Sequence, residues 1–154
     1  ILMCFAFSIF LVISVIDWRT FEIPFSLNVA IGVLAVIRII LDYKNLLDYL
    51  IGFCIISGFM LICLYIGRAI KGIDAFGGGD IKLMAFAGLF LGWKYIILAF
   101  LIGCILGAVI HSIRMKVTKA EHVLAFGPYL CAGLTIAMLF GTNIINWYLS
   151  LMAF

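Results

Sequence analysis

The sequence has few charged residues: only 11% of its 154 residues are Asp, Glu, Lys or Arg, whereas 68% are hydrophobic. An average soluble domain is about 25% charged and about 45–50% apolar. Because a small globule leaves much of its surface in water, a chain of this length cannot hide such an excess of apolar side chains in a core. The composition therefore excludes an ordinary soluble globule and indicates an integral membrane protein.

The sequence also lacks the patterns of several common binding sites. Its net charge is only +3, and no cluster of Lys and Arg indicates a nucleic-acid partner. The five cysteines form no C-x-x-C pair, so we expect neither a disulfide framework nor a zinc site. The glycine run at 77–79 is not followed by the Lys-Ser/Thr of a phosphate-binding loop. We therefore expect no metal, no cofactor and no nucleic acid.

The few charged residues divide the chain into uncharged, mostly apolar segments. A helix that spans a membrane needs about 20 apolar residues, with a range of about 17–25. The uncharged segments are 1–16, 23–37, 49–67, 83–93, 95–110 and 123–154. The pattern predicts an all-α polytopic membrane protein with six transmembrane helices and short loops. No internal repeat or shift in composition divides it, so we treat residues 1–154 as a single membrane domain.

Two of the six segments have unusual lengths. The fourth is short unless its helix opens near Gly79–Asp80, which would put that turn at the membrane boundary. The last is too long for one untilted helix. We expect Gly127–Pro128 to open it, because proline suits the first helical turn, and we expect residues 141–143 to bend or break it.

The distribution of Lys and Arg predicts the orientation. The first, third and fifth loops hold seven of these residues, and the second and fourth loops hold three. The positive-inside rule therefore places the odd-numbered loops in the cytoplasm and both chain ends outside.

Two carboxylates stand at the membrane boundary on the cytoplasmic side. Asp17 follows the first apolar segment, and Asp80 follows the glycine run and opens the fourth. An acidic group is costly in a membrane, about 2.5–3.5 kcal/mol at mid-span. Two carboxyls that share a proton can act as acid and base at once, one taking a proton from water while the other protonates a carbonyl oxygen. The pair indicates peptide hydrolysis, although Asp80 alone is equally well explained as a helix cap.

Three motifs, in order along the chain, resemble those of type IV prepilin peptidases, which are polytopic GxGD aspartic proteases. Residues 17–24 (DWRTFEIP) resemble the D-x-R-x-x-x-I-P motif, and residues 77–85 (GGGDIKLMA) resemble G-x-G-D-x-K-L-x-A. Residues 126–133 (FGPYLCAG) are similar to the late F-G-P-[FY]-L-x-x-G segment. The resemblance thus runs from the first apolar segment to the last.

The resemblance implies that Asp17 and Asp80 are the catalytic pair. It also implies that other motif residues shape the site or bind the substrate: Gly77, Gly78, Gly79, Lys82 and Pro24. The substrate would be a prepilin or pseudopilin with a transmembrane helix and a basic leader, which the family cleaves after a glycine. The reaction would take place at the cytoplasmic face of the bacterial inner membrane.

The sequence departs from the family pattern at one important point. Many members carry an N-terminal cytoplasmic insert with two C-x-x-C pairs and also N-methylate the new amino terminus. This sequence has no such insert, so it resembles a short form or a trimmed chain, and N-methyltransferase activity is not implied.

Other polar residues have simpler interpretations. Asp74, His111 and His122 are best explained as solvated loop or surface residues, although Glu22 and Asp74 could attract a basic leader. Three other functions remain open: a preflagellin-type or other GxGD protease, a structural membrane subunit, and a small proton- or cation-coupled carrier that uses the aspartates as a relay. A carrier should show inverted repeats, which we do not find.

Overall fold

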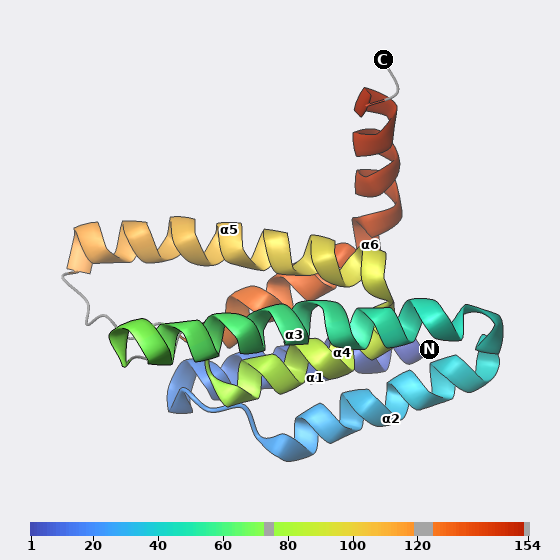
Figure 1. Ribbon diagram of the computed structural model, residues 1–154, viewed down its shortest axis with the longest axis horizontal. Helices are drawn as coiled ribbons and strands as arrows, with labels where there is room; N and C mark the ends of the chain where they lie inside the picture. Colours follow the sequence, from blue (N-terminus) through green and yellow to red (C-terminus); the bar gives the residue numbers. More distant parts are fainter. Residues whose placement is uncertain (73–75, 119–124, 153–154) are drawn as a thin grey trace.

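The computed structural model describes residues 1–72, 76–118 and 125–152, and this part of the chain forms six α-helices (Figure 1). The helices are α1 (Leu2–Thr20), α2 (Phe25–Leu41), α3 (Leu46–Lys71), α4 (Gly78–Leu91), α5 (Trp93–Thr118) and α6 (Gly127–Met152), with a short 3₁₀ turn η1 (Tyr43–Asn45). The all-α prediction is confirmed, and so is the opening of the fourth helix at the glycine run.

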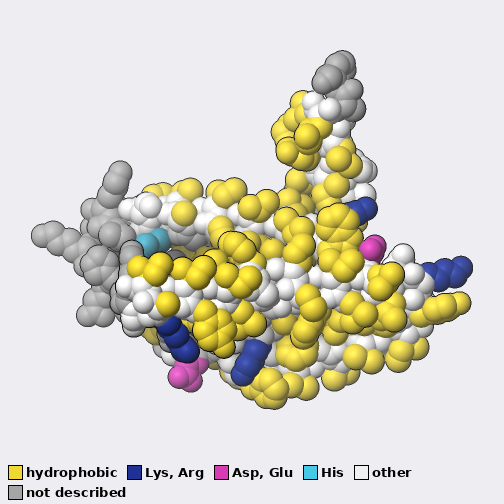
Figure 2. All heavy atoms as spheres, viewed as in Figure 1, with side chains coloured by type: hydrophobic (Ala, Val, Ile, Leu, Met, Phe, Trp, Pro, Cys, Tyr) yellow, Lys and Arg dark blue, Asp and Glu magenta, His cyan; other side chains and the backbone are white. Residues whose placement is uncertain are grey.

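The helices have the lengths and surfaces of a membrane bundle. Among the described residues, four segments are long and apolar enough to cross a membrane: Leu2–Thr20, Tyr43–Ile70, Trp93–Arg114 and Gly127–Met152. Helix α2 is a shorter apolar helix of 17 residues. Hydrophobic side chains cover most of the face seen in Figure 2, with few charged groups among them. Such a surface suits lipid rather than water, and the chain is a multi-pass membrane protein.

Helix α4 lies at the centre of the bundle and contacts α2, α3, α5 and α6. It has only 14 residues, about 21 Å at 1.5 Å per residue. Its side chains at Leu83, Met84, Ala87 and Phe90 are fully buried. A short helix with so many buried apolar residues is stable here because the neighbouring helices cover it from Leu83 onwards, whereas Gly78 and Lys82 near its start are exposed.

Glycines allow close approach between neighbouring helices. A Cβ added to Gly52 of α3 would overlap the carbonyl oxygen of Gly88 in α4, and the reverse is also true. Gly133 of α6 packs in the same way against the Ala99 carbonyl of α5. Small residues at such contacts let the backbones interlock, as is usual in membrane bundles.

The ends of the helices define two faces of the bundle. At one end α1 finishes while α2, α4 and α6 begin, and α3 and α5 extend past this level (Figure 1). At the other end, the C-terminal part of α6 turns away from the bundle. The helical hydrogen-bonding pattern is continuous through residues 141–143, so the chain bends there without breaking its helix.

Candidate active site

The turn between α1 and α2 places Asp17 at the end of α1. The backbone N–H of Phe21 donates to the Asp17 carbonyl at 2.9 Å and closes the last helical turn. Phe21 takes a left-handed conformation with φ 55°, and the chain then reverses so that Pro24 can precede the first residue of α2. Asp17 is only 4% exposed, so its carboxyl needs partners inside the protein.

Asp17 is held by the first residue of α6. The backbone N–H of Gly127 donates to Asp17 Oδ2 at 3.0 Å. Helix N-termini favour negative charge because their first N–H groups have no partner within the helix. A Cβ at Gly127 would lie 2.6 Å from that same Oδ2 atom, so this close approach requires glycine.

Asp80 lies in the first turn of α4. The residue at the cap position is Gly77, so Asp80 does not cap the helix itself. Its carboxyl turns back towards Gly77, where an added Cβ would lie 3.1 Å from Asp80 Oδ2. The other oxygen, Oδ1, is buried and accepts no hydrogen bond from any residue that the structure describes. Asp80 therefore carries a buried polar atom whose hydrogen-bonding capacity is not met by the described residues.

The two carboxyls open into the same cavity, which has a volume of about 280 Å³. They line it together although 63 positions separate them in the sequence. The cavity is lined by Asp17, Phe21, Glu22, Ile23, Gly77, Gly78, Gly79 and Asp80. The structure thus brings together five of the residues that the sequence marked: the two aspartates and the three glycines.

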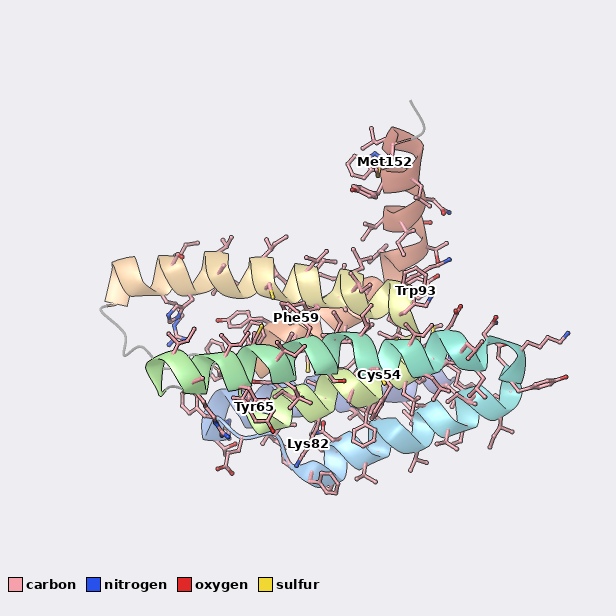
Figure 3. The ribbon with its side chains drawn as sticks, viewed as in Figure 1. Cys54, Phe59, Tyr65, Lys82, Trp93 and Met152 are labelled. Atoms are coloured by element: carbon pink, nitrogen blue, oxygen red, sulfur yellow. The ribbon has the colours of Figure 1, made fainter. Side chains whose placement is uncertain are left out.

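Lys82 and Pro24, which were expected beside the aspartates, are not among the described residues that line this cavity. The Lys82 ammonium lies 5.2 Å from the centre of the Phe25 ring, near the start of α2 (Figure 3). Pro24 occupies the cap position of α2, where it directs the backbone from the Asp17 turn into that helix. Asp74 and His122 lie outside the described residues.

Asn28 contributes to the site and was missed by sequence reasoning. This side chain is fully buried in α2, and its Nδ2 atom donates to the Gly79 carbonyl at 3.4 Å. It therefore holds the residue next to Asp80. The signal in the sequence was a lone amide in an apolar segment, which has to find a partner when it is buried.

Two phenylalanines link the segments that carry the site. Phe76 immediately precedes the glycine run, and Phe126 immediately precedes Gly127. Their ring centres lie 5.8 Å apart, within the usual range for interacting aromatic pairs. This contact connects the start of α4, which carries Asp80, to the start of α6, which holds Asp17.

The described part of the chain contains no group of three His, Cys, Asp or Glu side chains placed to hold a metal ion. The cavity offers a carboxyl pair and, at Gly77 and Gly78, an exposed backbone without side chains. Two carboxyls so placed can move protons to and from a substrate by general acid–base chemistry.

Comparisons with known proteins give a consistent result. The model of the type IV leader peptidase family matches residues 4–112. The prepilin leader peptidase/N-methyltransferase of Legionella pneumophila is 44% identical over 75 residues, which cover 47% of this chain and 26% of that protein. The proteins of the same name from Stutzerimonas stutzeri and Pseudomonas aeruginosa are each 34% identical, over 53% and 56% of this chain and 29% and 31% of their own length. The matched region thus spans less than a third of these relatives. No solved structure matches the chain.

Proposed function

The chain belongs to the type IV leader peptidase family, and on this basis we propose that it is a membrane aspartic endopeptidase that removes the basic leader of prepilin-like proteins. The observation that carries the proposal is the single cavity into which both Asp17 and Asp80 open. The preflagellin-type and carrier alternatives have less support. The family model and the relatives are leader peptidases, and the cavity lies at the end of α1 rather than halfway along the bundle.

The proposed reaction needs only the two carboxyls and water. One carboxylate takes a proton from water, whose oxygen attacks the scissile carbonyl, while the other carboxyl donates its proton to the carbonyl oxygen. Collapse of the tetrahedral intermediate breaks the C–N bond, and the leaving amine takes up a proton. The Gly127 N–H supports this chemistry because it fixes one oxygen of Asp17. A carboxylate that is already oriented does not have to be ordered during the reaction, so the activation free energy is lower.

The glycine run suits an extended peptide substrate. Gly77 and Gly78 are exposed, and a Cβ at Gly78 would meet no heavy atom of the described residues within 4 Å. A substrate backbone can therefore lie along this turn without meeting side chains. Glu22 adds a third carboxyl to the cavity lining, which favours a basic leader.

The proposed setting is the bacterial inner membrane, with the cavity facing the cytoplasm. The orientation rests on the excess of Lys and Arg in the odd-numbered loops, such as Arg19 and Arg68 on the side of the cavity. We treat residues 1–154 as a single catalytic membrane domain. The partners are a prepilin or pseudopilin with a transmembrane helix, and the lipid bilayer. N-methylation remains a property of the named relatives and is not proposed for this chain.

The test is processing of a prepilin with a basic leader and a glycine at the junction, co-expressed with the protein and followed by its size on a gel. Asp17→Asn and Asp80→Asn keep the shape of each side chain but remove its ability to transfer a proton, so each should abolish processing. Asp48→Asn is the matched control, because this exposed carboxyl lines a different cavity at the other end of the bundle. Normal processing by either variant of the pair would refute the proposal. A chelator should leave cleavage intact.

A further inference from the structure

The last part of α6 does not follow the direction of the other helices. In Figure 1 helices α1 to α5 run along the length of the bundle, whereas the C-terminal part of α6 runs across it. The buried residues of α6 end at Gly141, and every residue from Thr142 to Met152 is partly or fully exposed. Because the spanning helices define the membrane normal, a helix across their direction lies along the plane of the membrane.

The bend is fixed by contacts with the start of α5. The Tyr95 ring packs against Gly141, where a Cβ would lie 2.5 Å from the ring carbon Cδ1. The hydroxyls of Tyr95 and Thr142 are hydrogen-bonded at 3.0 Å. The bend therefore lies level with the first turn of α5, at the opposite end of the bundle from Asp17.

Polar residues mark this level as a membrane–water boundary. Tyr95 shares a cavity of about 230 Å³ with charged residues from the α2–α3 connection and from the first turns of α3 and α5, among them Asp42, Asp48 and Lys94. The Lys94 ammonium lies 5.5 Å from the centre of the Trp93 ring. Tryptophan beside lysine is typical of the interface between headgroups and acyl chains.

Residues 142–152 form an amphipathic helix. At 3.6 residues per turn, its four polar side chains fall within an arc of about 100°, and the remaining ones are apolar. The polar residues are Thr142, Asn143, Asn146 and Ser150. Trp147 and Tyr148 belong to the apolar side and are 64% and 57% exposed. Helices of this kind lie in the interface with their apolar face among the lipid chains.

We propose that residues 142–152 are an interfacial helix, which lies in the headgroup region of the bilayer on the side opposite the aspartates. Its polar arc faces water, and its apolar face contacts the acyl chains of that leaflet. Only residues 127–141 of α6 then cross with the bundle, about 22 Å at 1.5 Å per residue. The interfacial helix resists movement of the bundle along the membrane normal and so sets the depth of the aspartate cavity in the opposite leaflet. This proposal does not depend on proteolysis.

Tryptophan depth in vesicles tests the proposal. One variant keeps only Trp147 (Trp18→Phe, Trp93→Phe), and its matched control keeps only Trp93 (Trp18→Phe, Trp147→Phe). Each is reconstituted into phosphatidylcholine vesicles brominated at a shallow or a deep acyl position. We expect both to be quenched mainly by the shallow bromines, and the depths of the two tryptophans to differ by no more than about one helical turn, roughly 5 Å.

If α6 stood upright instead, Trp147 would lie about 9 Å beyond Gly141. Aqueous iodide, rather than brominated lipid, would then quench it and overturn the proposal. Shielding of Trp147 from both quenchers would indicate contact with a second copy of the chain and would overturn it as well.

Cysteine labelling provides a test without the tryptophan changes. Asn146 and Tyr148 are both exposed, but they lie on opposite faces of the helix. A membrane-impermeant maleimide supplied on both sides of the vesicles should label Asn146→Cys at least tenfold faster than Tyr148→Cys. The unsubstituted protein serves as the blank for the five native cysteines. Equal labelling of the two variants would refute an interfacial position.

Discussion

Asp17 Oδ2 accepts a hydrogen bond of 3.0 Å from the backbone N–H of Gly127, 110 positions further along the chain. This bond joins the end of the first helix to the start of the last. Because Phe126 also packs against Phe76, the same junction reaches the glycine run that precedes Asp80. The relative positions of the two carboxyls therefore depend on a few backbone and ring contacts that mutation can test.

Gly127→Ala should reduce cleavage about 10- to 100-fold, because its Cβ would lie 2.6 Å from Asp17 Oδ2 and would displace the carboxyl. A misplacement of about 1 Å can cost about 10²-fold in rate. Gly58→Ala in α3 is the control, since no described heavy atom lies within 4 Å of its Cβ position. It should instead add roughly 0.5–1 kcal/mol of stability. Cleavage rates and thermal unfolding in detergent measure both effects. Wild-type cleavage by Gly127→Ala would show that the close contact has no bearing on catalysis.

The Phe76–Phe126 contact should couple the two halves of the site. In a double-mutant cycle with Phe76→Leu and Phe126→Leu, we expect a coupling free energy of about 0.5–1.5 kcal/mol, the usual value for an aromatic pair. It should appear in the cleavage rate as well as in the unfolding transition. The control cycle uses Phe53 and Phe86, whose ring centres lie 6.3 Å apart between α3 and α4, away from the cavity. For Phe53 and Phe86 we expect a coupling free energy in the unfolding transition but none in the cleavage rate. Additive effects of Phe76 and Phe126 on the rate would show that the two turns act independently.

Much of the fold could be predicted from the sequence, because charges, glycines and prolines mark the ends of apolar helices. The start of α4 at the glycine run, the start of α6 at Gly127 and its bend at residues 141–143 all follow from such marks. The pairing of helix faces could not be predicted in this way. The contact of Gly52 with Gly88 depends on how two helices rotate against each other, and one-dimensional periodicity does not contain that information.

The candidate site shows the same limit. Lys82 was expected beside Asp80 because it is two positions away in a motif. Side chains at i and i+2 of a helix point in nearly opposite directions, so Lys82 extends to Phe25 instead of the cavity. Asn28 was missed because its partner, the Gly79 carbonyl, is 51 positions away. That Asp17 and Asp80 are catalytic stays a prediction for the processing experiment.

Asn28→Leu should slow cleavage about tenfold. The substitution removes the side-chain donor to the Gly79 carbonyl, and the loss of one such hydrogen bond costs about 0.5–1.5 kcal/mol. Because the Gly79 turn positions Asp80, kcat should fall more than KM rises. Ser57→Ala is the control: Ser57 is also buried, but its hydroxyl bonds to the Phe53 carbonyl of its own helix. A loss of stability without a change in kcat would limit Asn28 to a structural role.

Lys82→Met should reduce cleavage no more than about fivefold. The ammonium contacts the Phe25 ring on the outside of α4, and an exposed cation–π contact contributes about 0.5–1 kcal/mol. Met keeps the length of the side chain, so the substitution tests the charge. A loss of 100-fold or more, comparable to removal of a catalytic group, would show that the ammonium reaches the substrate. Varying the ionic strength separates the two cases further, since a long-range effect on a charged substrate is screened by salt.

The connection between α2 and α3 should make stability depend on pH. Asn45 donates to both Asp42 oxygens at 3.1 and 2.9 Å, and the Tyr49 hydroxyl donates at 3.0 Å. These bonds, that from Asn45 first, lower the pKa of Asp42 below its ordinary value of 3.8. The folded protein therefore binds this proton more weakly than the unfolded chain does. The resulting stabilisation is present above about pH 4 and is lost as the pH falls through the lowered pKa.

We expect the unfolding temperature of the wild type to exceed that of Asp42→Asn near neutral pH, and the difference to vanish in acid. Tyr49→Phe removes one donor and should keep part of the pH-dependent difference. A difference that stays constant from pH 7 to pH 3 would show that the amide loses packing or hydrogen bonds unrelated to the charge.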